Sequence, residues 1–214
     1  MTTTQVLTEN ALLARARACL SKEDCRILYA EWAATYNSDL ADASQEYVAP
    51  MLLAQTALKY VRTPEVSILD AGCGTGLVGV ALAQGGVKTI DGLDLSPDML
   101  KMAEGAGVYR NLDSGDLTQQ IEKADDTYDI VTCAGTFTHG HVGPDPALRE
   151  FVRITKKNGF VAATVIEDLW LSGGFEREVK RLEAVGLVKV VSVELKDYRR
   201  GVGDKATVIV LEKL

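Results

Sequence analysis

The chain has 214 residues, of which 25% are charged and 47% hydrophobic, and its net charge is −7 at pH 7. This length favours a single domain, and the composition is that of an ordinary globular protein. The acidic balance argues against sequence-independent nucleic-acid binding, which needs a basic surface. No apolar run reaches the roughly 18 residues of a membrane span, and the first ten residues lack the regions of a signal peptide. We therefore expect a cytoplasmic protein.

The chain contains four cysteines, Cys19, Cys25, Cys73 and Cys133, and only two histidines. No two of these cysteines form the Cys-x-x-Cys pair that structural zinc sites commonly use. The sequence therefore predicts no metal site and four reduced, buried thiols.

Two helices are predicted before the first strand. The first spans 5–20, and the second begins at the capping-box pattern Ser21–Asp24. Along the second helix, Tyr29, Trp32 and Tyr36 recur at helical spacing and share one face. Such a stripe packs on a core in most proteins, but it also suits a lid whose rings cover a cofactor. We favour the lid.

Alternating strand and helix patterns follow over the rest of the chain. Strands are predicted over 67–70, 87–94, 108–112, 128–133, 160–165, 188–197 and 206–213, and helices over about 45–61 and 76–84, after Ser96, after Asp145 and around Phe175–Leu182. The link 198–204 is too short for a crossover helix, so the last two strands must be antiparallel.

This element order predicts an α/β fold of the doubly wound, Rossmann-like type. Its seven-stranded sheet would be mostly parallel, with a C-terminal antiparallel hairpin at one edge. Residues 1–48 would form a helical cap or lid and residues 49–214 the core, within one domain.

The most informative stretch is Ser67–Gly79, in which a short apolar run ends at Asp70 and is followed by Gly72, Gly74 and Gly76. Glycine accepts a positive φ and lets a ligand approach the backbone, and a helix start offers unpaired N–H groups. The spacing G-x-G-x-G differs from the dinucleotide pattern G-x-G-x-x-G, and the lysine of a Walker-type phosphate loop is absent.

The string Leu69–Gly76 resembles the first motif of class I S-adenosylmethionine-dependent methyltransferases. Tyr29–Asn37 is similar to the segment that precedes the sheet in many small members, although Ala30 and Asn37 depart from the aspartates often found there. Thr136–Pro144 resembles a loop of small methyltransferases related to the Williams–Beuren-region methyltransferase-like proteins. This similarity covers about residues 26–186 and implies S-adenosylmethionine as the cofactor and S-adenosylhomocysteine as its product.

The resemblance also assigns residues at the carboxyl ends of the strands, where ligands bind in such sheets. Leu93–Met99 resembles the second family motif and selects Asp94, rather than its neighbour Asp91, as the ligand of the ribose hydroxyls. Asp116 would select the adenine, although it also suits an ordinary loop. The residues assigned to the cofactor are Tyr29, Trp32, Tyr36, Asp70, Gly72, Gly74, Gly76, Asp94, Leu95, Met99, Asp116, Leu117, Cys133 and Gly135.

Both histidines, His139 and His141, fall in the loop after the predicted fourth strand. Histidine titrates near neutrality, so either is a candidate general base, and either could instead brace the loop. A metal would need a third ligand, for which only Asp145 lies nearby in the sequence. Trp170 and Phe175 could wall an acceptor pocket or belong to the core.

We therefore predict a methyltransferase that transfers the methyl group of S-adenosylmethionine to a small molecule by in-line displacement at a nitrogen, oxygen, sulfur or carbon atom. The alternative is a protein of this fold that binds the cofactor without methyl transfer, as an isomerase, a cyclase or a regulatory subunit. We expect a monomer or homodimer, with no nucleic-acid or membrane partner.

Overall fold

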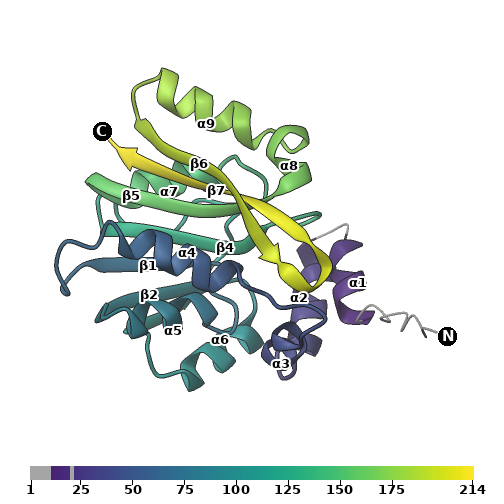
Figure 1. Ribbon diagram of the computed structural model, residues 1–214. Coiled ribbons are helices and arrows are strands. Elements are labelled where there is room, and N and C mark those ends of the chain that lie inside the picture. The colour runs from purple at the N-terminus through teal and green to yellow at the C-terminus, as the bar shows by residue number, and fades with distance from the viewer. Residues whose placement is uncertain (1–10, 20–21) are drawn as a thin grey trace.

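A computed structural model describes residues 11–19 and 22–214 of the chain. Its centre is a seven-stranded sheet in the order β3-β2-β1-β4-β5-β7-β6 (Figure 1). The strands are β1 (Ser67–Ala71), β2 (Thr89–Asp94), β3 (Asn111–Ser114), β4 (Tyr128–Phe137), β5 (Thr155–Ile166), β6 (Val188–Arg199) and β7 (Asp204–Lys213). The first five are parallel, whereas β7 runs antiparallel to β5 and β6. The predicted Rossmann-like sheet with its C-terminal hairpin is confirmed.

Helices cover both faces of this sheet (Figure 1). They are α4 (Ala49–Leu58), α5 (Leu77–Gln84), α6 (Pro97–Gly105), α7 (Ala147–Ile154), α8 (Glu167–Ser172) and α9 (Phe175–Ala184). One face packs on α4 and α5 through a core that includes Leu53 and Ile90. The other packs on α7 and α9 through a core that includes Phe137 and Leu182. Burial on both faces explains why the central strands are almost continuously apolar.

Three further helices form a cap on the sheet. They are α1 (Ala11–Arg17), α2 (Lys22–Trp32) and α3 (Tyr36–Ala41). Leu28 and Trp32 are almost fully buried among them. The Trp32 indole N–H donates to Asp39 Oδ2 at 2.7 Å, so its polar atom is satisfied. The turn that contains Gly72, Gly74 and Gly76 is called the glycine turn. The hydroxyl of Thr75 in this turn donates to Asn37 Oδ1 at 2.5 Å and so connects α3 to the core.

Element boundaries in the first half of the chain differ from the predicted ones. The helix predicted over 45–61 begins only at Ala49, because the residues before it pair with the C-terminal hairpin, as in the bridge between Tyr47 and Arg199. The patterns predict neither α3 nor α8 as a separate helix. Residues 5–10 and 20 of the first predicted helix, and Ser21 of the capping box, lie outside the described residues.

Element boundaries in the second half of the chain also differ from the predicted ones. The third strand begins at Asn111 rather than at 108, because Tyr109 is used to reach Asp70 beneath the glycine turn. β4 continues to Phe137, so residues 134–137 are strand rather than loop. The next helix ends at Ile154, and β5 begins at Thr155 rather than at 160.

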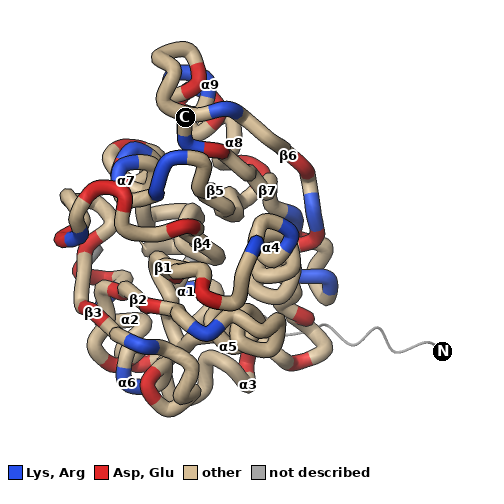
Figure 2. The backbone as a smooth tube through the Cα atoms, turned by 90° about the vertical axis from the view of Figure 1, so that its left-hand side faces the viewer, with Lys and Arg blue, Asp and Glu red and all other residues tan. Residues whose placement is uncertain are grey.

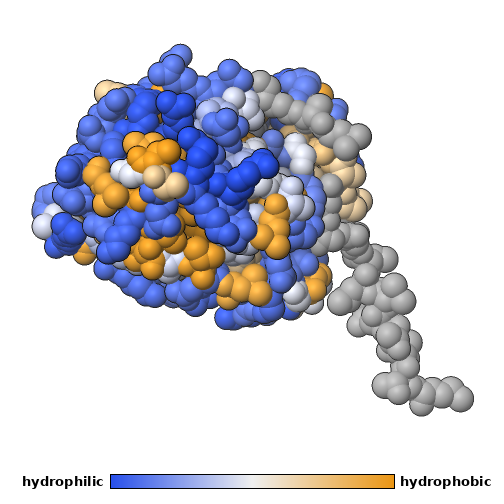
Figure 3. Space-filling view, turned by 90° about the horizontal axis from the view of Figure 1, so that it is seen from above, coloured by the Kyte–Doolittle hydropathy of each residue, from blue (hydrophilic) through white to orange (hydrophobic). Residues whose placement is uncertain are grey.

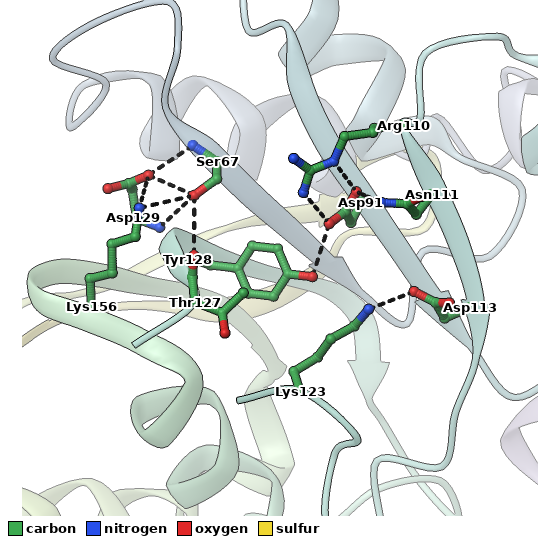
Figure 4. Close-up of polar contacts among 10 residues, drawn as sticks. All are labelled: Ser67, Asp91, Arg110, Asn111, Asp113, Lys123, Thr127, Tyr128, Asp129 and Lys156. Carbon is green, nitrogen blue, oxygen red and sulfur yellow. Dashed lines mark hydrogen bonds and ion pairs between the residues drawn. The ribbon is translucent and has the colours of Figure 1, made fainter. Parts of the chain in front are cut away.

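A polar cluster joins the middle strands at Asp91 (Figure 4). Its carboxylate accepts hydrogen bonds from Arg110 Nε at 2.9 Å and Nη2 at 2.6 Å, from Asn111 at 3.0 Å and from the Tyr128 hydroxyl at 3.0 Å. Burial alone would raise the pKa of Asp91, but the donors Arg110 and Tyr128 outweigh it and lower the pKa. Asp91 therefore links β2, β3 and β4, and it does not compete with Asp94 for a ligand.

The described surface is mixed in character. Basic and acidic residues are interspersed along the chain (Figure 2). Seen from above, apolar areas lie among polar ones (Figure 3). The edge strand β6 exposes Val191, Val193 and Leu195, each by more than a third. Within the described residues, helices long and apolar enough to cross a membrane are absent.

The Asp91 cluster yields the first prediction. Asp91→Ala should lower the free energy of unfolding by about 2–3 kcal/mol at pH 7, because it removes charged hydrogen bonds and leaves the buried Tyr128 hydroxyl without an acceptor. Because the pKa of Asp91 is lowered in the folded protein, this contribution should shrink as the pH falls below about 4. Urea unfolding at several pH values measures it. Lys123→Ala, which breaks the partly exposed ion pair with Asp113, is the control and should cost less than about 1 kcal/mol. Equal losses would contradict the prediction.

Candidate functional site

The glycine turn joins β1 to α5 in a left-handed conformation. Gly72, Gly74 and Gly76 have φ values of 70°, 54° and 95°. The Gly72 N–H donates to the Leu93 carbonyl at 2.7 Å, which ties the turn to β2. A Cβ on Gly72 would lie 2.2 Å from Thr136 Oγ1, whereas one on Gly74 would meet nothing within 4 Å. The turn is therefore packed at its first glycine and open at its second.

Asp94, at the end of β2, is held by backbone donors on both sides. Its Oδ2 accepts from the Gly74 N–H at 2.8 Å, and its Oδ1 accepts from the Ser96 N–H at 2.9 Å. The Ser96 hydroxyl in turn accepts from the Met99 N–H at 3.4 Å and caps α6, as the sequence predicts. Burial raises the pKa of Asp94, and these N–H donors oppose the rise. The carboxylate is thus fixed in orientation at the edge of a cavity.

Two cavities lie between the sheet and the cap. The inner cavity is lined by Cys25, Arg26, Tyr29, Tyr36, Gly72, Gly74, Asp94, Leu95, Ser96, Met99, Gly115, Asp116, Leu117, Thr118, Ala134, Gly135, Thr136, His141 and Val142. The outer cavity, of about 510 Å³, is lined by Leu13, Ala16, Tyr29, Trp32, Tyr36, Leu40, Tyr47, Gly135, Thr138, His139, His141, Ile166, Glu167, Asp168, Tyr198, Arg199, Gly203, Asp204 and Lys205. Of the described residues, Tyr29, Tyr36, Gly135 and His141 line both.

Most residues assigned to the cofactor border the inner cavity, but four do not. Trp32 borders only the outer cavity, and Asp70, Gly76 and Cys133 border neither. Gly76 instead begins α5, and Cys133 is fully buried in the sheet. These residues shape the turn and the core, and their assignment to the cofactor stays a prediction.

Asp70 organises the turn from below. It is fully buried and accepts from the Tyr109 hydroxyl at 2.7 Å and from the Thr132 hydroxyl at 3.3 Å. Burial raises its pKa to about 6, although the two hydroxyl donors and the Gly79 N–H oppose the rise. These contacts give Asp70 a role in organising the turn.

The two histidines have different surroundings. His141 Nδ1 lies 2.6 Å from the His139 carbonyl oxygen, and its Nε2 lies 3.0 Å from the Tyr29 hydroxyl. Burial lowers the pKa of His141. His139 is more exposed, and its Nε2 lies 2.8 Å from Asp168 Oδ2 of α8. Only His141 therefore stands where the two cavities meet.

The C-terminal hairpin supplies walls of the outer cavity that sequence reasoning missed. The Val48 N–H donates to the Tyr198 carbonyl at 3.1 Å, and the Tyr47 and Tyr198 rings meet at 5.1 Å. In the sequence, the hairpin signals only a sheet edge, because its approach to the cap requires a long-range contact. The one sequence feature that could have indicated this contact is the large side chain of Tyr198 at the start of the glycine-containing link 198–204.

The candidate acceptor walls after β5 are not at the cavity. Phe175 is buried in the core against Phe137, with ring centroids 4.8 Å apart, and Trp170 packs on the same core. Ile166, Glu167 and Asp168, just before them, line the outer cavity instead. Within the described residues, clusters of three or more His, Cys, Asp or Glu side chains that could hold a metal are absent.

Comparison with known proteins agrees with this geometry. Residues 68–159 match the family model described as a methyltransferase domain. The chain is 33% identical over 165 residues to human methyltransferase-like protein 27, covering 74% of this chain and 66% of that protein. It is 30% identical over 114 residues to the mitochondrial ubiquinone biosynthesis O-methyltransferase of Saccharomyces cerevisiae, covering 50% of this chain and 36% of that protein. The cyclase SpnF superposes with a TM-score of 0.68 at 16% identity, over 91% of this chain and 97% of SpnF.

The chain therefore belongs to the class I S-adenosylmethionine-dependent methyltransferases. It spans about two thirds of the length of the human relative and about a third of the yeast one. Membership implies S-adenosylmethionine as the cofactor. The inner cavity fits this group, because the open side of Gly74 leaves room for a ligand against the backbone, beside the Asp94 carboxylate and the apolar side chain of Met99.

The buried carboxyl of Asp70 gives a second prediction. Carbon-13 NMR should find its titration midpoint near pH 6, and Tyr109→Phe should raise the midpoint further, because it removes a donor to the carboxylate. A raised folded-state pKa means that Asp70 favours folding below about pH 4 and that this benefit is lost as the pH rises through about 6. Asp70→Asn identifies the resonance. A midpoint near 4, or a fall in Tyr109→Phe, would contradict the prediction.

Proposed function

We propose that this protein transfers the methyl group of S-adenosylmethionine to a small molecule that binds in the outer cavity. The observation that supports this most strongly is the shared border of the two cavities. Tyr29, Tyr36, Gly135 and His141 line both, so a cofactor in the inner cavity and an acceptor in the outer one would meet there. Alignment of the two reactants and exclusion of water are the main demands of methyl transfer.

The residues that line the inner cavity would each bind a different part of the cofactor. S-adenosylmethionine, when bound, supplies an electrophilic methyl group on a sulfonium. The Asp94 carboxylate would accept hydrogen bonds from the ribose hydroxyls. Met99 and Leu117 would pack on the adenine, and Asp116 would accept from its amino group. The Gly135 carbonyl would hold the ammonium group.

The outer cavity favours a largely apolar, ring-shaped acceptor. Five of its side chains are aromatic, namely Tyr29, Trp32, Tyr36, Tyr47 and Tyr198. Aromatic walls bind flat rings well because they bury large apolar areas with little loss of side-chain freedom. The yeast relative is an O-methyltransferase of ubiquinone biosynthesis. We therefore propose an oxygen nucleophile on a small aromatic acceptor.

Of the two candidate bases, we favour His141. A base must lie within hydrogen-bond reach of the proton that it removes. His141 borders both cavities, whereas His139 borders only the outer one and is held by Asp168. Burial lowers the pKa of His141, so the ring is neutral and able to accept a proton at physiological pH.

The alternative is cofactor binding without methyl transfer. SpnF, whose fold superposes over most of the chain, is a cyclase. The inner cavity would serve either activity equally. Formation of S-adenosylhomocysteine during turnover distinguishes them, because only methyl transfer produces it.

The glycine turn provides a matched test of cofactor binding. Gly74 and Gly86 both have positive φ, and a Cβ on either would meet nothing within 4 Å, but only Gly74 borders the inner cavity. Each change to alanine should cost about 1–2 kcal/mol of stability. Calorimetric titration should find S-adenosylhomocysteine affinity reduced at least about tenfold in Gly74→Ala, equivalent to ~1.4 kcal/mol, and unchanged in Gly86→Ala. Unchanged affinity in both would contradict this placement.

Asp94 tests the same site through charge. Asp94→Ala should weaken S-adenosylmethionine binding by about tenfold to a hundredfold, because hydrogen bonds to a charged acceptor contribute about 1.5–3 kcal/mol. Thermal unfolding of the variant separates lost binding from lost folding, since Asp94 also accepts the Gly74 and Ser96 N–H groups. If the wild-type protein binds neither S-adenosylmethionine nor S-adenosylhomocysteine, the proposed function is wrong.

The acceptor itself is best sought by activity. Wild-type protein, metabolite extracts and methyl-labelled S-adenosylmethionine should yield a labelled, small, aromatic product together with S-adenosylhomocysteine. The same reaction with Asp94→Ala is the control. Label found only in protein or nucleic acid would argue against a small-molecule acceptor.

A further inference from the structure

A hydrogen bond between two side chains connects the cap to the loop that follows β4 and carries both histidines (the histidine loop). It lies at the shared border of the two cavities. The Tyr29 hydroxyl, on α2, lies 3.0 Å from His141 Nε2, and the two rings meet edge to face with centroids 5.5 Å apart. Both residues line both cavities. A proton that leaves an acceptor in the outer cavity would therefore find these two groups next to it.

The other side of the His141 ring fixes the direction of this hydrogen bond. Nδ1 lies 2.6 Å from the His139 carbonyl oxygen, which can only accept, so the neutral ring carries its hydrogen on Nδ1. The Thr138 hydroxyl lies 3.1 Å from the same nitrogen. Nε2 therefore holds the free electron pair, and the Tyr29 hydroxyl is the donor. The phenol oxygen keeps its own electron pairs for a further donor.

We propose that Tyr29 is a catalytic residue that passes the acceptor's proton to His141, and that the acceptor presents a hydroxyl group to the Tyr29 oxygen. This inference rests on the proposed function. Tyr29 was expected only to cover the cofactor, and its position gives it a chemical role as well. A phenol hydroxyl suits the task, because it donates and accepts at the same atom and can relay a proton without becoming charged.

The step balances as follows. The acceptor oxygen forms a bond to the methyl carbon while the carbon–sulfur bond breaks, with its electron pair remaining on sulfur. The acceptor O–H proton moves to the Tyr29 oxygen as the Tyr29 proton moves to His141 Nε2. One positive charge leaves the sulfonium and one appears on the imidazolium. The His139 carbonyl, which already accepts from Nδ1, stabilises that imidazolium.

The neighbouring groups do not offer the same path. Tyr36 lines both cavities, but the hydrogen bonds recorded for the described residues do not join it to a histidine. The Tyr47 hydroxyl is engaged with Tyr198. Other titratable groups that line the same two cavities include Cys25 on α2, Asp94 at the end of β2, and His139, which is paired with Asp168 of α8.

The chain's two histidines allow a direct NMR test. In nitrogen-15-labelled protein saturated with S-adenosylhomocysteine, His141 should appear as the Nδ1–H form, with assignment from His141→Gln. Tyr29→Phe should leave this form intact but shift the Nε2 resonance, because its hydrogen-bond donor is lost. Tyr36→Phe, the matched control, should leave the His141 nitrogens unchanged. An Nε2–H form of His141, or an unshifted Nε2 in Tyr29→Phe, overturns the proposal.

Kinetic measurements then distinguish a catalytic role of Tyr29 from that of a latch, meaning a hydrogen bond that only holds the cap against the histidine loop. With 2-naphthol as acceptor, Tyr29→Phe should lower kcat by at least about a hundredfold, the usual range for general acid–base groups, with little change in KM. With methyl phenyl sulfide, which has no proton to lose, the same change should leave the rate within about threefold of wild type. A raised KM with unchanged kcat, or equal losses for both acceptors, would mean a latch and overturn the proposal. If neither compound is methylated, the NMR result decides.

These outcomes are distinguishable from failure of the proposed function. That function fails if the wild-type protein does not bind S-adenosylmethionine, whatever the state of His141. The relay fails if binding and methyl transfer persist at full rate in Tyr29→Phe.

Discussion

The rest of the site depends on the contact between the glycine turn and Asp94. One carboxylate accepts the N–H of Gly74, in the turn between β1 and α5, and the N–H of Ser96, at the start of α6. It thereby fixes two adjacent strand ends and a helix start relative to one another. Glycine adopts left-handed conformations readily but is flexible, so these two hydrogen bonds hold the turn in one shape.

Three aspartates in the first two strands show how surroundings assign different roles to one residue type. Asp70 is fully buried beneath the turn, and its pKa is raised to about 6. Asp91 is surrounded by donors, above all Arg110, and its pKa is lowered. Asp94 has backbone donors and borders a cavity. Only the last combines a fixed orientation with access to a ligand.

The cap completes the site from the opposite side. It meets the core through Thr75 and Asn37 at the glycine turn and through Tyr29 and His141 at the histidine loop. Asn37 is one of the positions at which the sequence departs from the family pattern, and here its amide oxygen accepts a hydrogen bond directly. The aromatic stripe on α2 and α3 serves both interpretations considered for it, because Trp32 is buried in the cap and borders only the outer cavity, whereas Tyr29 and Tyr36 border both cavities.

The sequence by itself determined the seven strands, most of the helices, the antiparallel hairpin and the glycine turn, because these follow from local periodicity, capping residues and short links. It also identified Asp94, His139 and His141 as polar groups at strand ends. Only the tertiary structure separated His141 from His139, removed Asp70 and Cys133 from the cavities, and brought Tyr47 and Tyr198 to the outer one. Those outcomes depend on contacts between segments far apart in the chain. Such contacts produce no repeating pattern of residues from which they could be predicted.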